Sequence, residues 1–303
     1  AAADRPAAAG DDGCTDDDAA TPYAARHDYV ERFAPLHRLV GVGTSDRDPT
    51  GMVEALVRRG ADPGAYSRKG LSPLHLAAQL GKARACTALV RAGADAALPR
   101  LGCGRGTPIH AAVRHGKVAA LRAILDALPP GHPAVDARST DGSTPLHLAA
   151  AAGSVDACEA LLDAGADAAA ATLDGDRPLH VAVWTNAIPV AEILMARGAD
   201  PNARKRDGST VLHLCAARGL FSMAQACLDG GADPSIKTVS GSTARERALL
   251  FRDDRLARAL APAAAHGVEG SAEGSGVEGS VAAAPGVEGS AAAPGGEGSA
   301  AAP

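Results

Sequence analysis

The sequence has few aromatic side chains and no long hydrophobic run. Its 303 residues include one Trp, three Tyr and three Phe, so aromatic residues make up 2 % of the chain although hydrophobic residues make up 46 %. Sandwiches and barrels are rich in aromatic and β-branched residues, so this composition favours closely packed helices. A helix needs roughly 20 consecutive apolar residues to cross a bilayer, and without such a run we expect no membrane insertion.

The six cysteines are scattered, and none forms a Cys-x-x-Cys pair. Disulfide frameworks and zinc sites show characteristic cysteine spacings, so we expect reduced, buried cysteines, no metal, and an intracellular location in the cytoplasm or nucleus. The sequence also lacks Gly-x-x-x-x-Gly-Lys-Ser/Thr, His-Glu-x-x-His and Gly-x-Ser-x-Gly. These motifs mark phosphate-binding loops, zinc proteases and hydrolases, so we expect no enzyme activity and no cofactor.

The formal net charge of −5 is unevenly distributed. Residues 1–20 carry −5 and residues 263–303 carry −5, which leaves +5 on residues 21–262. Both ends are rich in Ala and Gly and have almost nothing large to bury, so they cannot offset the entropy lost on folding. We therefore expect disordered segments at 1–22 and 263–303 around a folded domain at 23–262. A sharper hypothesis is that these acidic ends shield the basic domain until an acidic partner displaces them.

The middle of the chain is a tandem repeat. The phrase Thr-Pro-Leu-His or a close variant recurs with spacings of 33 to 38 residues, and its histidines are His37, His75, His110, His147, His180 and His213. Ser or Thr before Pro is typical of a helix start, and the glycines of the recurring Gly-Ala-Asp phrase are typical of helix ends. Each unit therefore predicts two short helices and an extended finger with a tight turn at its tip.

The period near 33 residues and this phrase closely resemble the ankyrin repeat, over roughly residues 33–261. The resemblance implies an all-α repeat solenoid of helix-turn-helix units with β-turn fingers, in which stacked neighbours supply the core. We expect a monomer with about six repeats and a C-terminal cap whose polar end, around Arg252 to Arg258, meets water. The expected units are 33–69, 70–104, 105–141, 142–174, 175–207 and 208–240, with the cap at 241–262.

The regularly spaced histidines recur along the array and do not converge on one point. A metal site needs three or four ligands around one ion, so we expect no metal site here. In the ankyrin family this histidine braces neighbouring loops through hydrogen bonds, and the resemblance implies the same role. A weaker resemblance, from Leu194 eight residues before Asn202, points to asparagine hydroxylation, but Pro201 stands where Val is usual.

The resemblance also implies protein binding on the concave side, through finger tips and the ends of the first helices. By register, the candidate partner-binding residues are Arg68, Lys69, Leu80, Arg105, Arg114, His115, Trp184, Thr185, Arg204, Lys205, Arg206 and Arg218. Trp and Arg are enriched among binding hot spots, and Trp184 is the only Trp of the chain. The alternatives are that Trp184 packs as filler beneath a finger and that the arginines form a solvated face.

The leading hypothesis is a non-catalytic protein-interaction module or scaffold that binds a partner protein on the concave surface, and an acidic partner is one candidate. Nucleic acid is not expected, because residues 21–262 carry only +5 and lack interleaved basic and aromatic residues. The second hypothesis is a regulatory or targeting segment of a larger protein, such as an enzyme, a channel or a ubiquitin-ligase adaptor. It is motivated by a chain that begins at Ala1 without Met.

Overall fold

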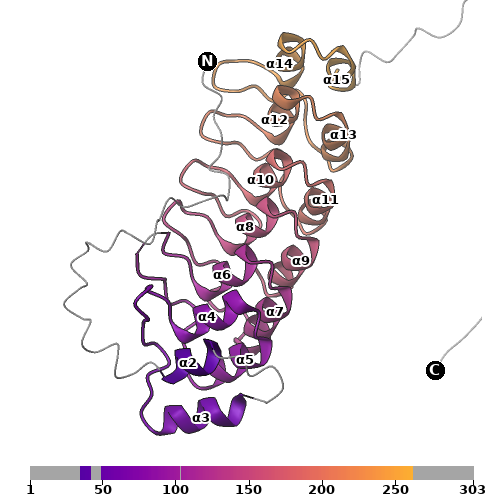
Figure 1. Ribbon diagram of the computed structural model, residues 1–303. Coiled ribbons are helices and arrows are strands. Elements are labelled where there is room, and N and C mark those ends of the chain that lie inside the picture. The colour runs from indigo at the N-terminus through magenta and orange to yellow at the C-terminus, as the bar shows by residue number, and fades with distance from the viewer. Residues whose placement is uncertain (1–34, 42–48, 103, 262–303) are drawn as a thin grey trace, which may run out of the picture. The chain divides into compact units, whose positions relative to one another are not determined.

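Fourteen short helices form the regular structure of the residues that this computed structural model describes, which are 35–41, 49–102 and 104–261. Figure 1 shows the helices in two layers, with the fingers beside one of them. The inner helices, next to the fingers, are α2 (Pro35–Gly41), α4 (Pro73–Leu80), α6 (Pro108–Arg114), α8 (Pro145–Ala151), α10 (Pro178–Trp184), α12 (Val211–Arg218) and α14 (Ala244–Leu250). The outer helices are α3 (Thr50–Arg58), α5 (Ala83–Arg91), α7 (Val118–Ala127), α9 (Val155–Asp163), α11 (Ile188–Ala196), α13 (Phe221–Asp229) and α15 (Asp254–Ala259).

Each inner helix contacts the inner helix before and after it, and the outer helices do the same. Contacts between the two helices of one pair complete the stack. This arrangement confirms the predicted all-α repeat solenoid with a C-terminal cap. The predicted terminal segments at 1–22 and 263–303 lie outside the described residues.

The inner helices begin and end where the repeat phrase predicts. Ser72 has an extended backbone and its side chain accepts a hydrogen bond from the amide of His75, while Pro73 occupies the first turn. The helix ends at Gly81, which has φ +75°. Asn186 takes the corresponding left-handed position after α10, with φ +57°, because Asn tolerates this conformation better than most residues with a side chain.

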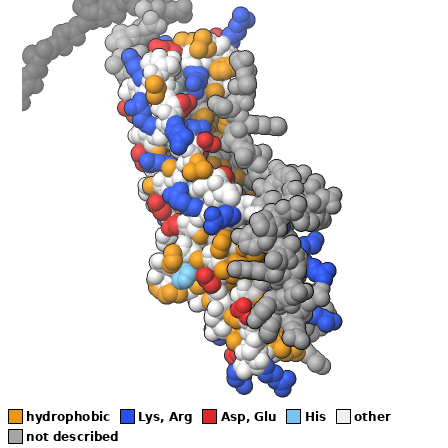
Figure 2. All heavy atoms as spheres, turned by 90° about the vertical axis from the view of Figure 1, so that its left-hand side faces the viewer, with side chains coloured by type: hydrophobic (Ala, Val, Ile, Leu, Met, Phe, Trp, Pro, Cys, Tyr) orange, Lys and Arg blue, Asp and Glu red, His pale blue; other side chains and the backbone are white. Residues whose placement is uncertain are grey.

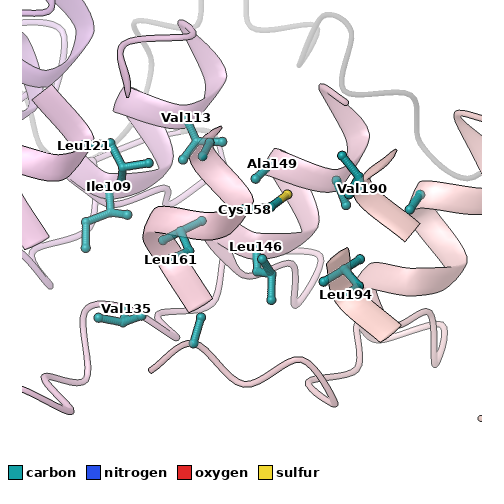
Figure 3. Close-up of a cluster of buried hydrophobic side chains, with 14 of the residues drawn as sticks. Ile109, Val113, Leu121, Val135, Leu146, Ala149, Cys158, Leu161, Val190 and Leu194 are labelled. Carbon is teal, nitrogen blue, oxygen red and sulfur yellow. The ribbon is translucent and has the colours of Figure 1, made fainter. Parts of the chain in front are cut away.

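The core consists of leucine and alanine, with few large side chains. Leu74 and Leu146 from the Pro-Leu-His phrase are fully buried, and so are the alanines one turn later, such as Ala149. Figure 3 shows how Ile109 and Leu146 from inner helices lie with Leu121 and Leu161 from outer helices in one continuous apolar layer. Small side chains let the helices approach closely, so each repeat buries its apolar face only against its neighbours.

The histidines of the phrase tie each repeat to the next finger. His75, His110, His147 and His213 place Nε2 at 3.1, 3.2, 3.0 and 3.1 Å from a backbone carbonyl of the following unit. A carbonyl only accepts, so Nε2 carries the proton and Nδ1 is free to accept from the backbone amide of the cap residue. The bracing role implied by the resemblance is therefore present at these joints.

His180 is the exception among the six phrase histidines. Its Nδ1 accepts from the amide of Arg177 at 3.2 Å, but within the described residues its Nε2 lacks the well-aligned carbonyl bond that the other phrase histidines make, and only the more distant Ala203 backbone interacts with the ring. Arg177 stands where the other units with a described cap have Ser or Thr. Burial lowers the pKa of His180 to about 4, as it does for His75 and His110.

The third repeat and the cap differ from the others in ways that their residues explain. Helix α7 ends at Ala127, just before Pro129 and Pro130, which cannot continue it. In the cap, Glu246 takes the histidine position, and its carboxylate accepts from the amide of Thr243 at 2.9 Å. The amide of Glu246 in turn donates to the Thr243 hydroxyl at 3.2 Å, which completes a reciprocal capping box at the start of α14.

The cysteines of the described residues behave as small apolar side chains. Cys86, Cys158, Cys215 and Cys227 are buried and free. Burial raises the pKa of Cys86 and of Cys158 to about 12, so both stay protonated thiols at neutral pH. None of the described helices has the length and apolarity that crossing a bilayer requires.

Candidate protein-binding surface

The fingers form a hydrogen-bonded row along one side of the stack. The amide of Leu173 donates to Asp141 O at 3.1 Å, and the amide of Val239 donates to Asp207 O at 3.0 Å, so each tip rests on the finger before it. Gly208 has φ +75°, and a Cβ there would lie 2.8 Å from the amide nitrogen of Val239. Glycine at this turn therefore permits both the conformation and the close approach.

The ends of the inner helices lie on the same side as the fingers, because the inner layer is the one beside them (Figure 1). In each repeat, the two residues at the C-terminal end of the inner helix remain accessible, whereas the Leu and Ala earlier in the helix are buried. They are Gln79 and Leu80, Arg114 and His115, Ala151 and Ala152, Trp184 and Thr185, Ala217 and Arg218, and Leu250 and Phe251. We call the accessible finger tips and these helix ends together the finger face.

The N-terminal half of the finger face is predominantly basic. Arg68, Lys69, Arg105 and Arg114 are all exposed, as the register predicts. Figure 2, which looks at the finger side, shows Lys and Arg side chains along this face. Partial burial and the nearby cations Arg114 and Lys117 lower the pKa of His115, so this imidazole is neutral at pH 7 and adds no charge.

Trp184 and Arg218 lie together on the C-terminal half of the finger face. The guanidinium carbon of Arg218 is 4.8 Å from the centroid of the Trp184 ring, which is the geometry of a cation–π contact between two repeats. Arg218 is exposed and Trp184 is half-buried. One face of the indole therefore contacts the arginine that borders the open surface.

Several of the sequence-predicted residues make hydrogen bonds or ion pairs inside the chain, among them Lys205, Arg204 and Thr185. Lys205 Nζ is 2.8 Å from Asp176 Oδ1, and both side chains are mostly buried. Arg204 donates through its guanidinium to the backbone of Gly208 and Lys237. The Thr185 hydroxyl donates toward Ala150 O and Val181 O at 3.2 and 3.1 Å. These side chains tie neighbouring repeats together, whereas Arg206, in the same finger as Lys205, is exposed.

The register argument missed an apolar patch at the cap. The cap was expected to meet water with polar residues, but Leu249, Leu250 and Phe251 at the end of α14 are 48, 79 and 62 % exposed. Counting from the helix cap, Thr243 corresponds to Thr210. Leu250 and Phe251 therefore occupy the same two finger-face positions as their counterparts in the earlier repeats. Aligning the cap with the repeats at Thr243 would have identified Leu250 and Phe251 from the sequence, although the cap lacks the Pro-Leu-His phrase.

The titratable side chains of the described residues do not converge on one point. In the ranges 35–41, 49–102 and 104–261, no three His, Cys, Asp or Glu residues gather in a way that could hold a metal ion. The phrase histidines contact carbonyls and caps, and the exposed cations lie on different repeats. This arrangement offers an extended surface for contact with another molecule.

Comparison with known proteins identifies the repeats. The family model described as "Ankyrin repeats (3 copies)" matches residues 44–131 and 118–205, and the model "Ankyrin repeat" matches residues 207–239. Among solved structures, the chain is similar to the ankyrin repeat domain of Bcl-3, described as a unique member of the IkappaB protein family. The identity is 31 % and the TM-score 0.66, with 74 % of this chain and 97 % of that chain covered. No curated protein sequence matches the chain.

Proposed function

Since the chain belongs to the ankyrin repeat family, whose domains generally act as protein–protein interaction modules, we propose that it binds a partner protein through its finger face. The matching family models are both ankyrin models, and such repeats are typically non-catalytic. The protein then works by bringing its partner to a fixed surface. The fold alone does not identify that partner. The kind of partner has to be inferred from the chemistry of the finger face.

The observation that carries this proposal is the stacked pair of Trp184 and Arg218. Both residue types are enriched at binding hot spots, and here they touch each other at the edge of the accessible surface. A ring held by a cation in the neighbouring repeat loses little conformational freedom when a ligand covers it, so its contacts contribute more to affinity.

The charge of the finger face supports an acidic partner. Residues 21–262 carry +5, and exposed arginines occur in both halves of the face, including Arg105 and Arg206. A face of one sign attracts carboxylates, accelerates encounter and disfavours basic partners. Lys205 adds little to this charge, because its ammonium pairs with the Asp176 carboxylate, whereas Arg204 is exposed and donates only to backbone carbonyls.

The test is affinity capture from nuclease-treated lysate with the full chain as bait. One variant carries Trp184→Ala, Arg114→Glu and Arg206→Glu on the finger face. A matched control carries Arg84→Glu, Arg91→Glu and Arg122→Glu, which change exposed arginines of the outer helices α5 and α7. Circular dichroism and urea unfolding check that all three baits are folded.

We expect a protein that is retained by the wild type and the control and lost from the finger-face variant. Its binding region should be acidic, and raising the salt concentration should weaken the complex. Equal retention by all three baits would contradict binding on the finger face and direct attention to the outer helices.

A further inference from the structure

The C-terminal end of the finger face gathers more exposed apolar side chains than the repeats before it, where Leu80 and Leu173 are 46 and 58 % exposed. Leu250 and Phe251 are 79 and 62 % exposed, and Val239 at the last finger tip is 80 % exposed. Exposed apolar side chains are ordinary when isolated, but a contiguous group marks an interaction site. Figure 2 shows hydrophobic side chains at the upper end of the stack, where the cap lies.

These side chains continue the contact between Trp184 and Arg218. Phe251 occupies in the cap the position that Arg218 occupies in the sixth repeat, and helices α12 and α14 pack directly against each other. Arg218 in turn reaches back over the Trp184 ring in the fifth repeat. We call Trp184, Arg218, Val239, Leu250 and Phe251 the C-terminal patch; it spans three neighbouring units.

Arginines lie around this patch with their charge available, while nearby carboxylates are engaged. Arg206 and Arg252 are exposed. In contrast, Asp207 accepts from the amide and the hydroxyl of Ser209 at 2.9 and 2.7 Å. Asp253 caps α15 by accepting from the amide of Leu256 at 2.9 Å. Exposed cations, among them Arg206, Arg218 and Arg252, therefore lie around an apolar centre.

We propose that the C-terminal patch docks a partner-protein segment in which a bulky apolar side chain is flanked by carboxylates. The apolar anchor covers Leu250, Phe251 and the free side of Trp184, and the carboxylates pair with the surrounding arginines. This assignment rests on the proposed function and specifies the ligand chemistry. Buried aromatic and aliphatic anchors with a charged rim form the typical architecture of a tight interface.

The acidic segments 1–20 and 263–303 do not supply such a ligand. Residues 1–20 and 263–303 contain carboxylates but no aromatic residue, Leu, Ile or Met. These segments could pair with the arginines, but they have no bulky apolar side chain to cover the centre of the patch. A second copy is also a poor occupant, because a two-fold contact would set Arg218 and Arg252 of one copy against the same residues of the other.

The experiment selects ligands from a displayed library of random 16-residue peptides on the full chain. Selected peptides are synthesised and titrated while Trp184 fluorescence is followed; because Trp184 is the only Trp of the chain, the signal reports the patch itself. The patch variant carries Leu250→Ser and Phe251→Ser. The matched control carries Leu80→Ser and His115→Ser, which change the equivalent helix-end position in the second and third repeats. Circular dichroism confirms that both variants are folded.

We expect the selected peptides to share a Leu, Phe or Trp next to Asp or Glu. Their binding should shift Trp184 emission to shorter wavelength, and the patch variant should bind them at least about ten-fold more weakly, as loss of a hot spot does. The control should bind them like the wild type. Changing the anchor to Ser or the carboxylates to Lys in the peptide should abolish binding.

Three outcomes would overturn the inference. The library yields no peptide of this pattern, or the selected peptides bind the patch variant and the wild type equally, or sedimentation shows a dimer that the patch variant alone dissolves. If the peptides lose affinity for the Arg114→Glu variant but not for the patch variant, the finger face still binds protein and only this assignment fails. If neither variant matters, the proposed function fails with it.

Discussion

At the joint between the fourth and fifth repeats, the phrase histidine has a partner on each ring nitrogen. His147 Nδ1 lies 2.9 Å from the Thr144 hydroxyl, and Nε2 lies 3.0 Å from Asp176 O in the next finger. Since Nε2 donates to the carbonyl, the Thr144 hydroxyl donates to Nδ1. The joint is therefore closed by neutral hydrogen bonds that are buried from water.

At the next joint, between the fifth and sixth repeats, the same task is performed by different chemistry. Arg177 has no acceptor to cap the helix, and within the described residues His180 Nε2 lacks a well-aligned carbonyl bond. Instead, the Asp176 carboxylate pairs with Lys205 of the following finger at 2.8 Å. The solenoid thus tolerates the loss of one histidine bridge where an ion pair connects the neighbouring fingers.

Acidification should have the largest effect on both joints. Burial lowers the pKa of His75, His110 and His180 to about 4, whereas the unfolded chain holds histidine near its ordinary pKa of about 6.5. Below pH 6.5 these histidines become protonated in the unfolded state but stay neutral in the folded state. The free energy of unfolding should therefore fall by about 1.4 kcal/mol per pH unit for each such histidine, until the pH reaches the folded pKa near 4.

Urea unfolding at pH 7.5, 6.0 and 5.0 measures this dependence. Burial dominates at His180 as at His110, so His180→Gln and His110→Gln should each remove a similar share of the slope. A stability that is constant from pH 7.5 to 5.0 would contradict the burial of neutral histidines. A smaller share for His180 would show that the missing hydrogen bond leaves this ring open to water.

Removing each imidazole should show how much each joint contributes to the free energy of unfolding. His147→Ala deletes two side-chain hydrogen bonds and leaves a cavity, so we expect a loss of about 3 kcal/mol in the free energy of unfolding. His180→Ala leaves a similar cavity but no broken Nε2 bond, and it should cost about 1 kcal/mol less. Urea unfolding at pH 7.5 gives both values, and equal losses would mean that His180 is bonded in solution.

The ion pair of the second joint should contribute less than a histidine bridge. Lys205→Met leaves the Asp176 carboxylate, 13 % exposed, without its partner, and we expect a loss of about 1.5 kcal/mol, between the costs for exposed and for fully buried pairs. The control is Arg122→Met, which breaks the exposed pair with Asp156 at 3.8 Å and should cost under about 0.5 kcal/mol. Equal costs for the two changes would show that the buried position of Lys205 has no consequence for stability.

The fold could be predicted from the sequence because the residues that start and end the helices recur in most repeats. Pro73 and Gly81 mark the start and end of one helix, and the same marks return in the following repeats, so a single ambiguous unit does not matter. Asn186 departs from the glycine pattern without disturbing the fold, because Asn takes the left-handed conformation that Gly takes elsewhere. Local chemistry repeated many times therefore determines the solenoid.

The surface was less predictable, because register gives a residue's position and not its partners. Register located Trp184 at a helix end but could not show that Arg218 stacks on it. The register also placed the Lys205 side chain on the accessible surface, although it forms an ion pair with Asp176, which is distant in sequence. It also overlooked Phe251, because the polar residues that follow in the cap suggested a fully hydrated end.

The smallest expected effect comes from restoring at the second joint the cap that the first one has. Arg177→Thr would give His180 Nδ1 a hydroxyl donor and give the first turn of α10 an acceptor, at the cost of a 4.0 Å contact with Asp200. Caps of this kind contribute about 1 kcal/mol, so the variant should be more stable than the wild type by about that amount in urea at pH 7.5. Arg177→Val is the matched control, since it has the shape of Thr without the hydroxyl. If Val stabilises as much as Thr, then the gain comes from removing the arginine, and the added hydroxyl does not cap the helix.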